Sequence, residues 1–121
     1  MLLTGTCARC GATRELDRGA YACACGGPLD LPELPLDGEP DASRQGVWRY
    51  HRWLPPVPRL SLGEPTTPLV HLTPTVHVKL EGALPTGSFK DRGAALMVAG
   101  VAASGSKGGV VDSSGNAGAA I

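Results

Sequence analysis

The sequence has no excess of charge of either sign. Eleven basic and eleven acidic residues give a formal net charge of zero, and they balance on both sides of position 60, seven against seven and four against four. No segment concentrates lysine and arginine. Proteins that bind nucleic acids or anionic membranes depend on such clusters, so the composition argues against both kinds of partner.

Long apolar runs are also missing. No run approaches the ~20 residues of a transmembrane helix, and Met1–Gly5 is too short for the core of a signal peptide, which needs about 7 to 15 apolar residues. We therefore expect a cytoplasmic protein. Cysteines in that compartment are kept reduced, so they more often bind metals or take part in catalysis than form disulfides.

Proline and glycine divide the chain into three segments. Ten of the eleven prolines lie between Pro28 and Pro74, and nine of the seventeen glycines lie from Gly82 onward. We predict a cysteine-bearing head at 1–30, a proline-rich arm at 31–60 and the start of a catalytic domain at 61–121. The last residues read as the first turns of a helix without a stop signal, which predicts the N-terminal piece of a longer protein.

The four cysteines of the head have the spacing of a zinc ribbon, and they are Cys7, Cys10, Cys23 and Cys25. Gly11 and Gly26 follow the two pairs and permit tight turns. The second pair encloses one residue where two are usual, and twelve residues between the pairs are few for a two-hairpin ribbon. We predict a structural zinc site, with a redox-labile ribbon or a disulfide knot as alternatives. Four cysteine ligands leave no open position for a catalytic water.

The segment Pro85–Gly93 places a lysine in the first turn of a predicted helix. Ser88 is a good N-cap, and Asp91 three residues later gives an acidic variant of the capping box, so Lys90 falls near the second helical position. The positive end of the helix dipole disfavours an ammonium there. It favours the free amine, which is the form that attacks a carbonyl and builds a Schiff base. Lys90 is therefore a candidate nucleophile.

Strands and helices are predicted to alternate in the last third of the chain. We expect a strand at 76–80, a helix at 88–103, a short buried strand at 109–111 and a second helix from Asn116. This order predicts an α/β fold with parallel strands and a right-handed crossover. Both strand-to-helix loops then lie at one edge of the sheet, where ligands bind in such folds.

Three segments together resemble the threonine synthases, which are pyridoxal-phosphate enzymes of the β-family, or fold type II. They occur in the expected order: Leu62–Leu69, Pro85–Gly93 and Ser113–Gly118. The resemblance covers about half of the chain. It implies a parallel sheet with flanking helices, pyridoxal 5'-phosphate as cofactor, a small amino-acid substrate and a homodimer at full length.

The resemblance also implies roles for single residues. Lys90 would hold the cofactor covalently and then serve as general base and acid. Phe89 is similar to the aromatic residue that stacks on the pyridine ring, although it is equally well interpreted as a core residue. Asn116 is similar to the asparagine that binds the ring hydroxyl. The predicted substrate-carboxylate loop consists of Ser113, Ser114 and Gly115. An ordinary turn with an N-cap is the alternative for this loop.

The reaction implied by the resemblance converts O-phospho-L-homoserine and water into L-threonine and phosphate. A serine or threonine dehydratase, or an enzyme similar to cysteine synthase, is the enzymatic alternative, while a zinc-ribbon interaction module with an enzyme remnant is the alternative of another class. Leu84 departs from the asparagine that is usual in the family. The glycine-rich cup for the cofactor phosphate should lie after Ile121, so we expect these residues alone to be inactive.

Overall fold

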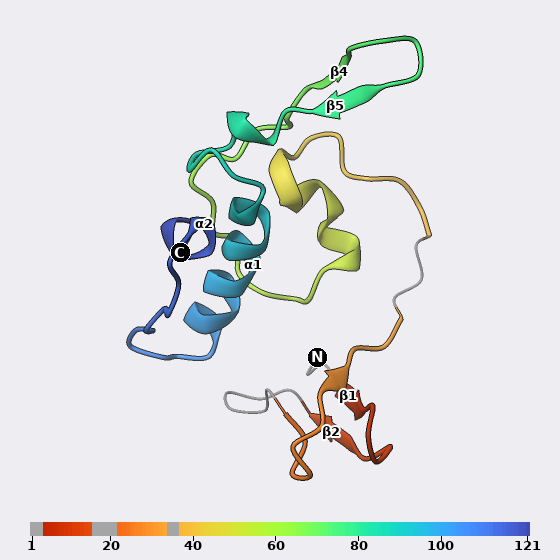
Figure 1. Ribbon diagram of the computed structural model, residues 1–121. Coiled ribbons are helices and arrows are strands. Elements are labelled where there is room, and N and C mark those ends of the chain that lie inside the picture. Colours follow the sequence, from red (N-terminus) through yellow and green to blue (C-terminus); the bar gives the residue numbers. More distant parts are fainter. Residues whose placement is uncertain (1–3, 16–21, 34–36) are drawn as a thin grey trace. The chain divides into compact units, whose positions relative to one another are not determined.

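The computed structural model describes residues 4–15, 22–33 and 37–121, so parts of the predicted head and arm lie outside the described residues. The chain divides into two compact units (Figure 1). The first comprises the described part of Met1–Gly38 together with Trp53–Pro56. The second comprises Glu39–Arg52 and Val57–Ile121. Each unit is described by itself below.

The first unit contains a small antiparallel sheet in the order β2-β1-β3. The strands are short: β1 covers Thr4–Cys7, β2 covers Thr13–Glu15 and β3 covers Leu29–Asp30. Residues of β1 alternate between exposed and buried, as a strand with one covered face requires, and the buried Cys7 ends the strand. The sheet thereby carries the first cysteine at its end.

A 3-10 helix, η1, covers Gly46–Trp53 and is kinked at Tyr50, and all of it except Trp53 belongs to the second unit. Proline-rich sequence on both sides of this segment removes backbone donors, and no α-helix forms between residues 37 and 68. Trp48 anchors η1, because its ring is buried and its Nε1 donates a 2.7 Å hydrogen bond to the carbonyl of Leu60. This bond joins η1 to the segment around Leu60 within the second unit.

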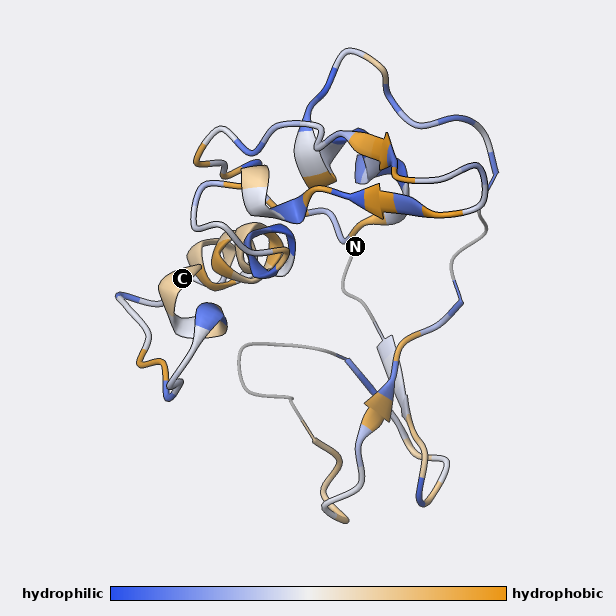
Figure 2. Ribbon diagram, turned by 45° about the horizontal axis from the view of Figure 1, so that its top comes forward, coloured by the Kyte–Doolittle hydropathy of each residue, from blue (hydrophilic) through white to orange (hydrophobic). Residues whose placement is uncertain are grey.

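A β-hairpin, a short 3-10 helix and two α-helices complete the second unit. They are β4 (Leu69–His71), β5 (His77–Lys79), η2 (Glu81–Ala83), α1 (Lys90–Ala103) and α2 (Asn116–Ala119). The helices α1 and α2 lie in contact. Most of α1 is apolar (Figure 2), and small buried residues such as Ala99 allow close packing on one side. No described helix combines the length and apolarity that crossing a bilayer requires.

The expected parallel sheet is not present among the described residues. The predicted strand at 76–80 exists as β5, but it pairs antiparallel with β4, with Val70 opposite Val78. A hairpin with a short loop brings these partners together at small cost in chain entropy, whereas a parallel pair needs a long crossover. Residues 109–111 form no strand, and Val110 is fully exposed. The two predicted helices are confirmed as α1 and α2.

Candidate functional site

A tight turn leads into the lysine segment. The Gly87 N–H donates to the Leu84 carbonyl over 2.8 Å, and Gly87 takes φ = 74°, a value that favours glycine. Leu84 is buried and anchors the start of the turn in the core of the unit. Leu84, which stands where the family usually has an asparagine, therefore anchors the loop by apolar burial and not by an amide side chain.

The predicted N-cap at Ser88 is wrong by one residue. Phe89 occupies the N-cap position with helical dihedral angles and no capping side chain, and α1 begins at Lys90. The Ser88 carbonyl accepts from the Asp91 N–H, which tightens the entry into a 3-10-like turn and delays the α-helical pattern. The Ser88 hydroxyl is buried and accepts the Lys90 N–H at 3.3 Å. The Ser88 side chain therefore still accepts a hydrogen bond from a backbone N–H in the first turn of α1.

Asp91 binds Thr86 in the loop before Lys90, which we call the lysine loop, and does not form the predicted capping box. Its Oδ2 accepts from the Thr86 N–H at 2.8 Å, and its Oδ1 accepts from the Thr86 hydroxyl. The Asp91 side chain is almost completely buried, so both oxygens need these donors. The residue after Lys90 consequently ties the helix to the loop five residues upstream. The sequence offered no signal for this partner beyond the acidic residue itself.

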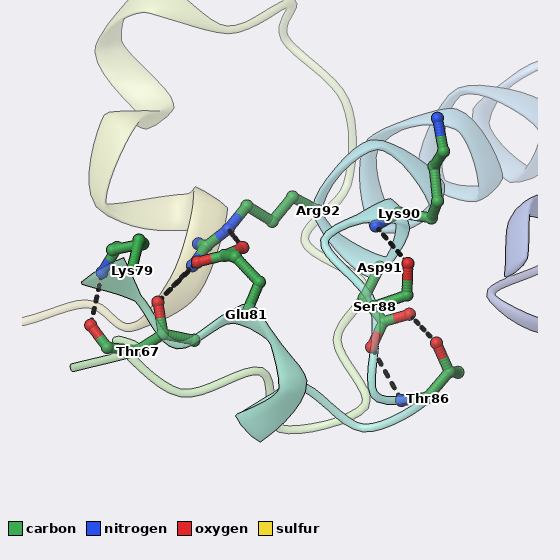
Figure 3. A network of polar contacts seen from close by, with 8 residues as sticks. All are labelled: Thr67, Lys79, Glu81, Thr86, Ser88, Lys90, Asp91 and Arg92. Carbon is green, nitrogen blue, oxygen red and sulfur yellow. Dashed lines mark hydrogen bonds and ion pairs between the residues drawn. The ribbon is translucent and has the colours of Figure 1, made fainter. Parts of the chain in front are cut away.

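Arg92 connects α1 to two other segments (Figure 3). Its guanidinium donates from Nε to Glu81 Oε2 at 2.7 Å and from Nη2 to Glu81 Oε1 at 2.9 Å. Nη2 also donates to Thr67 Oγ1 at 2.9 Å, and the Thr67 hydroxyl donates to Glu81 Oε1 at 2.6 Å. We call these three residues the Thr67–Glu81–Arg92 clamp. Lys79 Nζ donates to the carbonyl of Thr67 and supports it from β5.

Glu81 is expected to make the stability of the second unit depend on pH. The hydrogen bond from Arg92, with that from Thr67, lowers the pKa of Glu81 from 4.5 to about 2. A carboxylate with a lowered pKa stabilises the fold fully above its unfolded pKa, and this stabilisation is lost as the pH falls through about 2. The difference in urea midpoint between wild type and Glu81→Gln should therefore be largest near neutral pH and shrink toward acid.

Urea unfolding of both proteins at several pH values measures this difference. The exposed Asp112 lies outside the clamp, and Asp112→Asn is the matched control that removes the same charge. A midpoint difference for Glu81→Gln that stays constant from neutral to acid pH would contradict the role of the ionised Glu81.

Lys90 itself is exposed and has few contacts with the chain. Its Nζ lies 4.6 Å from the centre of the Phe89 ring, and within the described ranges no hydrogen bond or ion pair commits the amine. Phe89 is 58% exposed, so it is not a core side chain of this unit. An accessible primary amine beside an open aromatic face fits the aldehyde and ring of pyridoxal phosphate. A cavity of about 470 Å³ is lined by Phe89, Glu81 and Arg92, among others.

The predicted carboxylate loop precedes α2. The Ser113 hydroxyl accepts from the Gly115 N–H at 3.3 Å and from the Gly118 N–H at 3.0 Å. Ser114, Gly115 and Asn116 are exposed. Within the described part of the chain, no hydrogen bond joins this loop to Lys90. The contact of α1 with α2 brings the two helices together, and Ser113 acts locally as a cap.

The four cysteines gather at one place in the first unit. All four sulfur atoms lie within 4.8 Å of one another, although Cys7 and Cys25 are eighteen residues apart. The Sγ to Sγ distances are 3.6 Å for Cys7 and Cys25, 3.7 Å for Cys10 and Cys23, and 3.5 Å for Cys10 and Cys25. A tetrahedral zinc with Zn–S bonds of ~2.3 Å has sulfur edges of about 3.8 Å. The donor set therefore fits a zinc ion.

Glycines shape the turns around the cluster. Gly11 and Gly26 have φ values of 72° and 77°, as the predicted tight turns require. Gly27 was not singled out in the sequence, yet a Cβ atom there would lie 2.7 Å from the sulfur of Cys7. Only the folded geometry reveals this close approach.

Neighbouring donors push the thiol pKa values apart. The backbone N–H of Cys10 lowers the pKa of Cys7 to about 6. The N–H of Gly27 also favours the Cys25 thiolate, but the thiols of Cys10 and Cys7 outweigh it and raise the pKa of Cys25 to about 12. Cys7 thus favours its thiolate form, whereas the neighbouring thiols oppose ionisation of Cys25. A divalent cation bound by all four sulfurs would offset the repulsion between their thiolates.

Comparison with known proteins assigns the second half of the chain to a family. Residues 60–121, just over half of the chain, match the family described as "Pyridoxal-phosphate dependent enzyme". The chain belongs to this family. The matched region contains the clamp, Lys90 and the loop before α2. No solved structure matches the chain.

Several curated relatives carry the name threonine synthase. The chain is 39% identical over 105 residues to the threonine synthase of Methanocaldococcus jannaschii, covering 72% of this chain and 26% of the relative. It is 43% identical over 81 residues to that of Halalkalibacterium halodurans, covering 59% and 23%. It is 35% identical over 102 residues to that of Methanosarcina acetivorans, covering 72% and 25%. The chain thus spans about a quarter of the length of these relatives.

Proposed function

We propose that this chain forms the lysine-bearing part of a pyridoxal-phosphate enzyme that converts O-phospho-L-homoserine and water into L-threonine and phosphate. The observation that carries the proposal is the exposed Lys90 side chain at the start of α1, whose Nζ has no hydrogen bond or ion pair among the described residues and lies beside the exposed ring of Phe89. The names of the relatives support the choice of reaction within the family.

Lys90 would hold the cofactor covalently through Nζ and, once released, move a proton at the reacting carbon of the substrate. When bound, pyridoxal phosphate withdraws electrons from that carbon. The Phe89 ring would support the flat face of the cofactor, and Asn116 would donate a hydrogen bond to its ring hydroxyl. The loop of Ser113, Ser114 and Gly115 would bind the substrate carboxylate through its hydroxyl and N–H groups.

We further propose that the four-cysteine cluster binds one structural zinc and takes no part in the reaction. Four thiolates complete a tetrahedral shell and leave no position for a substrate or a water. The metal would then act on the stability of the predicted head at 1–30.

The proposed reaction is tested with the full reading frame that carries these residues, purified with pyridoxal phosphate. We expect phosphate and L-threonine to appear in equal amounts from O-phospho-L-homoserine. L-Serine and L-threonine serve as parallel substrates. Formation of ammonia and a 2-oxo acid from these two, with no release of phosphate from O-phospho-L-homoserine, would contradict the proposal and support the dehydratase alternative.

A further inference from the structure

The two residues that follow Lys90 are each bound to a different upstream segment. Asp91 receives two hydrogen bonds from Thr86 in the lysine loop. Arg92 donates hydrogen bonds to Glu81 in η2 and to Thr67 in the segment before β4. The first turn of α1 is therefore attached on two sides, while the Lys90 amine has no hydrogen-bond partner among the described residues.

Because Lys90 and Arg92 belong to the same helix, the attachment of Arg92 determines the direction of the Lys90 side chain. Residues two apart in an α-helix differ by about 200° around the axis, so Lys90 and Arg92 leave the helix on nearly opposite sides. Figure 3 shows the Lys90 side chain pointing away from Glu81 and Thr67, toward which Arg92 points. A helix that is held at Arg92 cannot rotate about its axis. Its rotation decides where the Lys90 amine lies.

The chemistry of the clamp suits a positioning role. The Arg92 guanidinium binds both oxygens of Glu81 and also Thr67, a planar arrangement that the single ammonium of a lysine cannot reproduce. Thr67 is almost completely buried, whereas Arg92 and Glu81 retain about a quarter of their side-chain exposure, at 26% and 23%. Besides its contribution to stability, a two-point ion pair fixes the relative position of the two segments that it joins.

We propose that the Thr67–Glu81–Arg92 clamp is a positioning device, which fixes the rotation of α1 and thereby aims Lys90 at the cofactor. Two clamp residues, Glu81 and Arg92, also line the cavity together with Phe89, the residue before Lys90. This inference rests on the proposed function of Lys90. Neither Glu81 nor Arg92 is assigned a contact with substrate or cofactor.

The test measures where pyridoxal phosphate reacts in the full reading frame that carries these residues. The protein is incubated with pyridoxal phosphate and reduced with borohydride, and mass spectrometry gives the ratio of pyridoxyl groups on Lys90 to those on the exposed Lys107. Arg92→Lys keeps the charge but removes the fork, and Glu81→Gln keeps the shape but removes the carboxylate. We expect each to lower the ratio roughly tenfold, since small misplacements of a reacting group have large effects on rate.

A matched control separates positioning from stability. Ala99 is fully buried in the same helix and lies outside the clamp, so Ala99→Gly should lower the melting temperature and leave the ratio unchanged. The double variant of Glu81→Gln and Arg92→Lys should be no worse than either single variant, because both break one interaction. Melting temperatures of all variants show that they are folded.

Three outcomes are decisive. A wild-type ratio in both Arg92→Lys and Glu81→Gln overturns the positioning role and leaves the proposed function intact. An equal fall in Ala99→Gly at the same melting temperature also overturns it, because the clamp would then act only through helix stability. Wild-type protein without a pyridoxyl group on Lys90 contradicts the proposed function itself.

Discussion

Lys90→Ala in the full reading frame is expected to lower the rate of phosphate release at least about 10²- to 10⁴-fold, the range that positioned proton transfer alone contributes. The variant should also lose all borohydride-stable pyridoxyl label at this position. The physical reason is that Lys90 presents the accessible amine at the start of α1, beside the open ring of Phe89. Phosphate release and peptide mapping after reduction measure the two effects.

Lys107→Ala is the matched control for this experiment. Lys107 is exposed and lies between α1 and α2, outside the clamp and the lysine loop, so its removal should leave phosphate release unchanged. Lys90→Arg keeps the positive charge but cannot supply a free amine near neutral pH, and it should be as inactive as Lys90→Ala. Wild-type phosphate release by Lys90→Ala, or a pyridoxyl group mainly on Lys79 or Lys107 and not on Lys90 in the wild type, would contradict the assignment.

Purification under reducing conditions is expected to yield about one zinc per chain, because four thiolates close a tetrahedral site. Cys7→Ser should abolish zinc binding and unfold the sheet of β1, β2 and β3. Binding free energies of structural zinc in small domains are on the order of 10–16 kcal/mol, and this free energy is available to the fold only when the ligands are complete. Elemental analysis and hydrogen exchange of the strand amides measure the two effects.

Thr13→Ser is the control for the zinc experiment, because Thr13 lies in the same sheet but outside the cluster. This variant should keep its zinc and its slow amide exchange. A zinc content near zero in wild-type protein, with all four thiols titrating freely, would rule out the metal site. Retained amide protection in zinc-free Cys7→Ser would show that the sheet folds without the ion.

Local signals in the sequence located the elements on which the site depends. The run of helix-forming residues after Phe89 predicted α1, and the short spacing within each cysteine pair predicted the cluster that the folded chain brings within 4.8 Å. Such signals act over a few residues, because capping, helix propensity and tight turns involve only neighbours along the chain. The start of α1 was nevertheless displaced from Ser88, where a 3-10-like turn competes with the predicted cap.

The tertiary structure decided which distant side chains meet. The sequence assigned Asp91 to a capping box with Ser88 and gave Arg92 no partner. Their observed partners lie five residues away for Thr86, eleven for Glu81 and twenty-five for Thr67. The sequence also did not reveal the antiparallel pairing of β4 with β5 or the close approach of Gly27 to Cys7. Such contacts form only when loops close and bring distant segments together. Which buried polar groups then pair depends on all the residues of the folded unit. The sequence by itself determined that a lysine begins a helix; the folded chain decided what holds that helix in place.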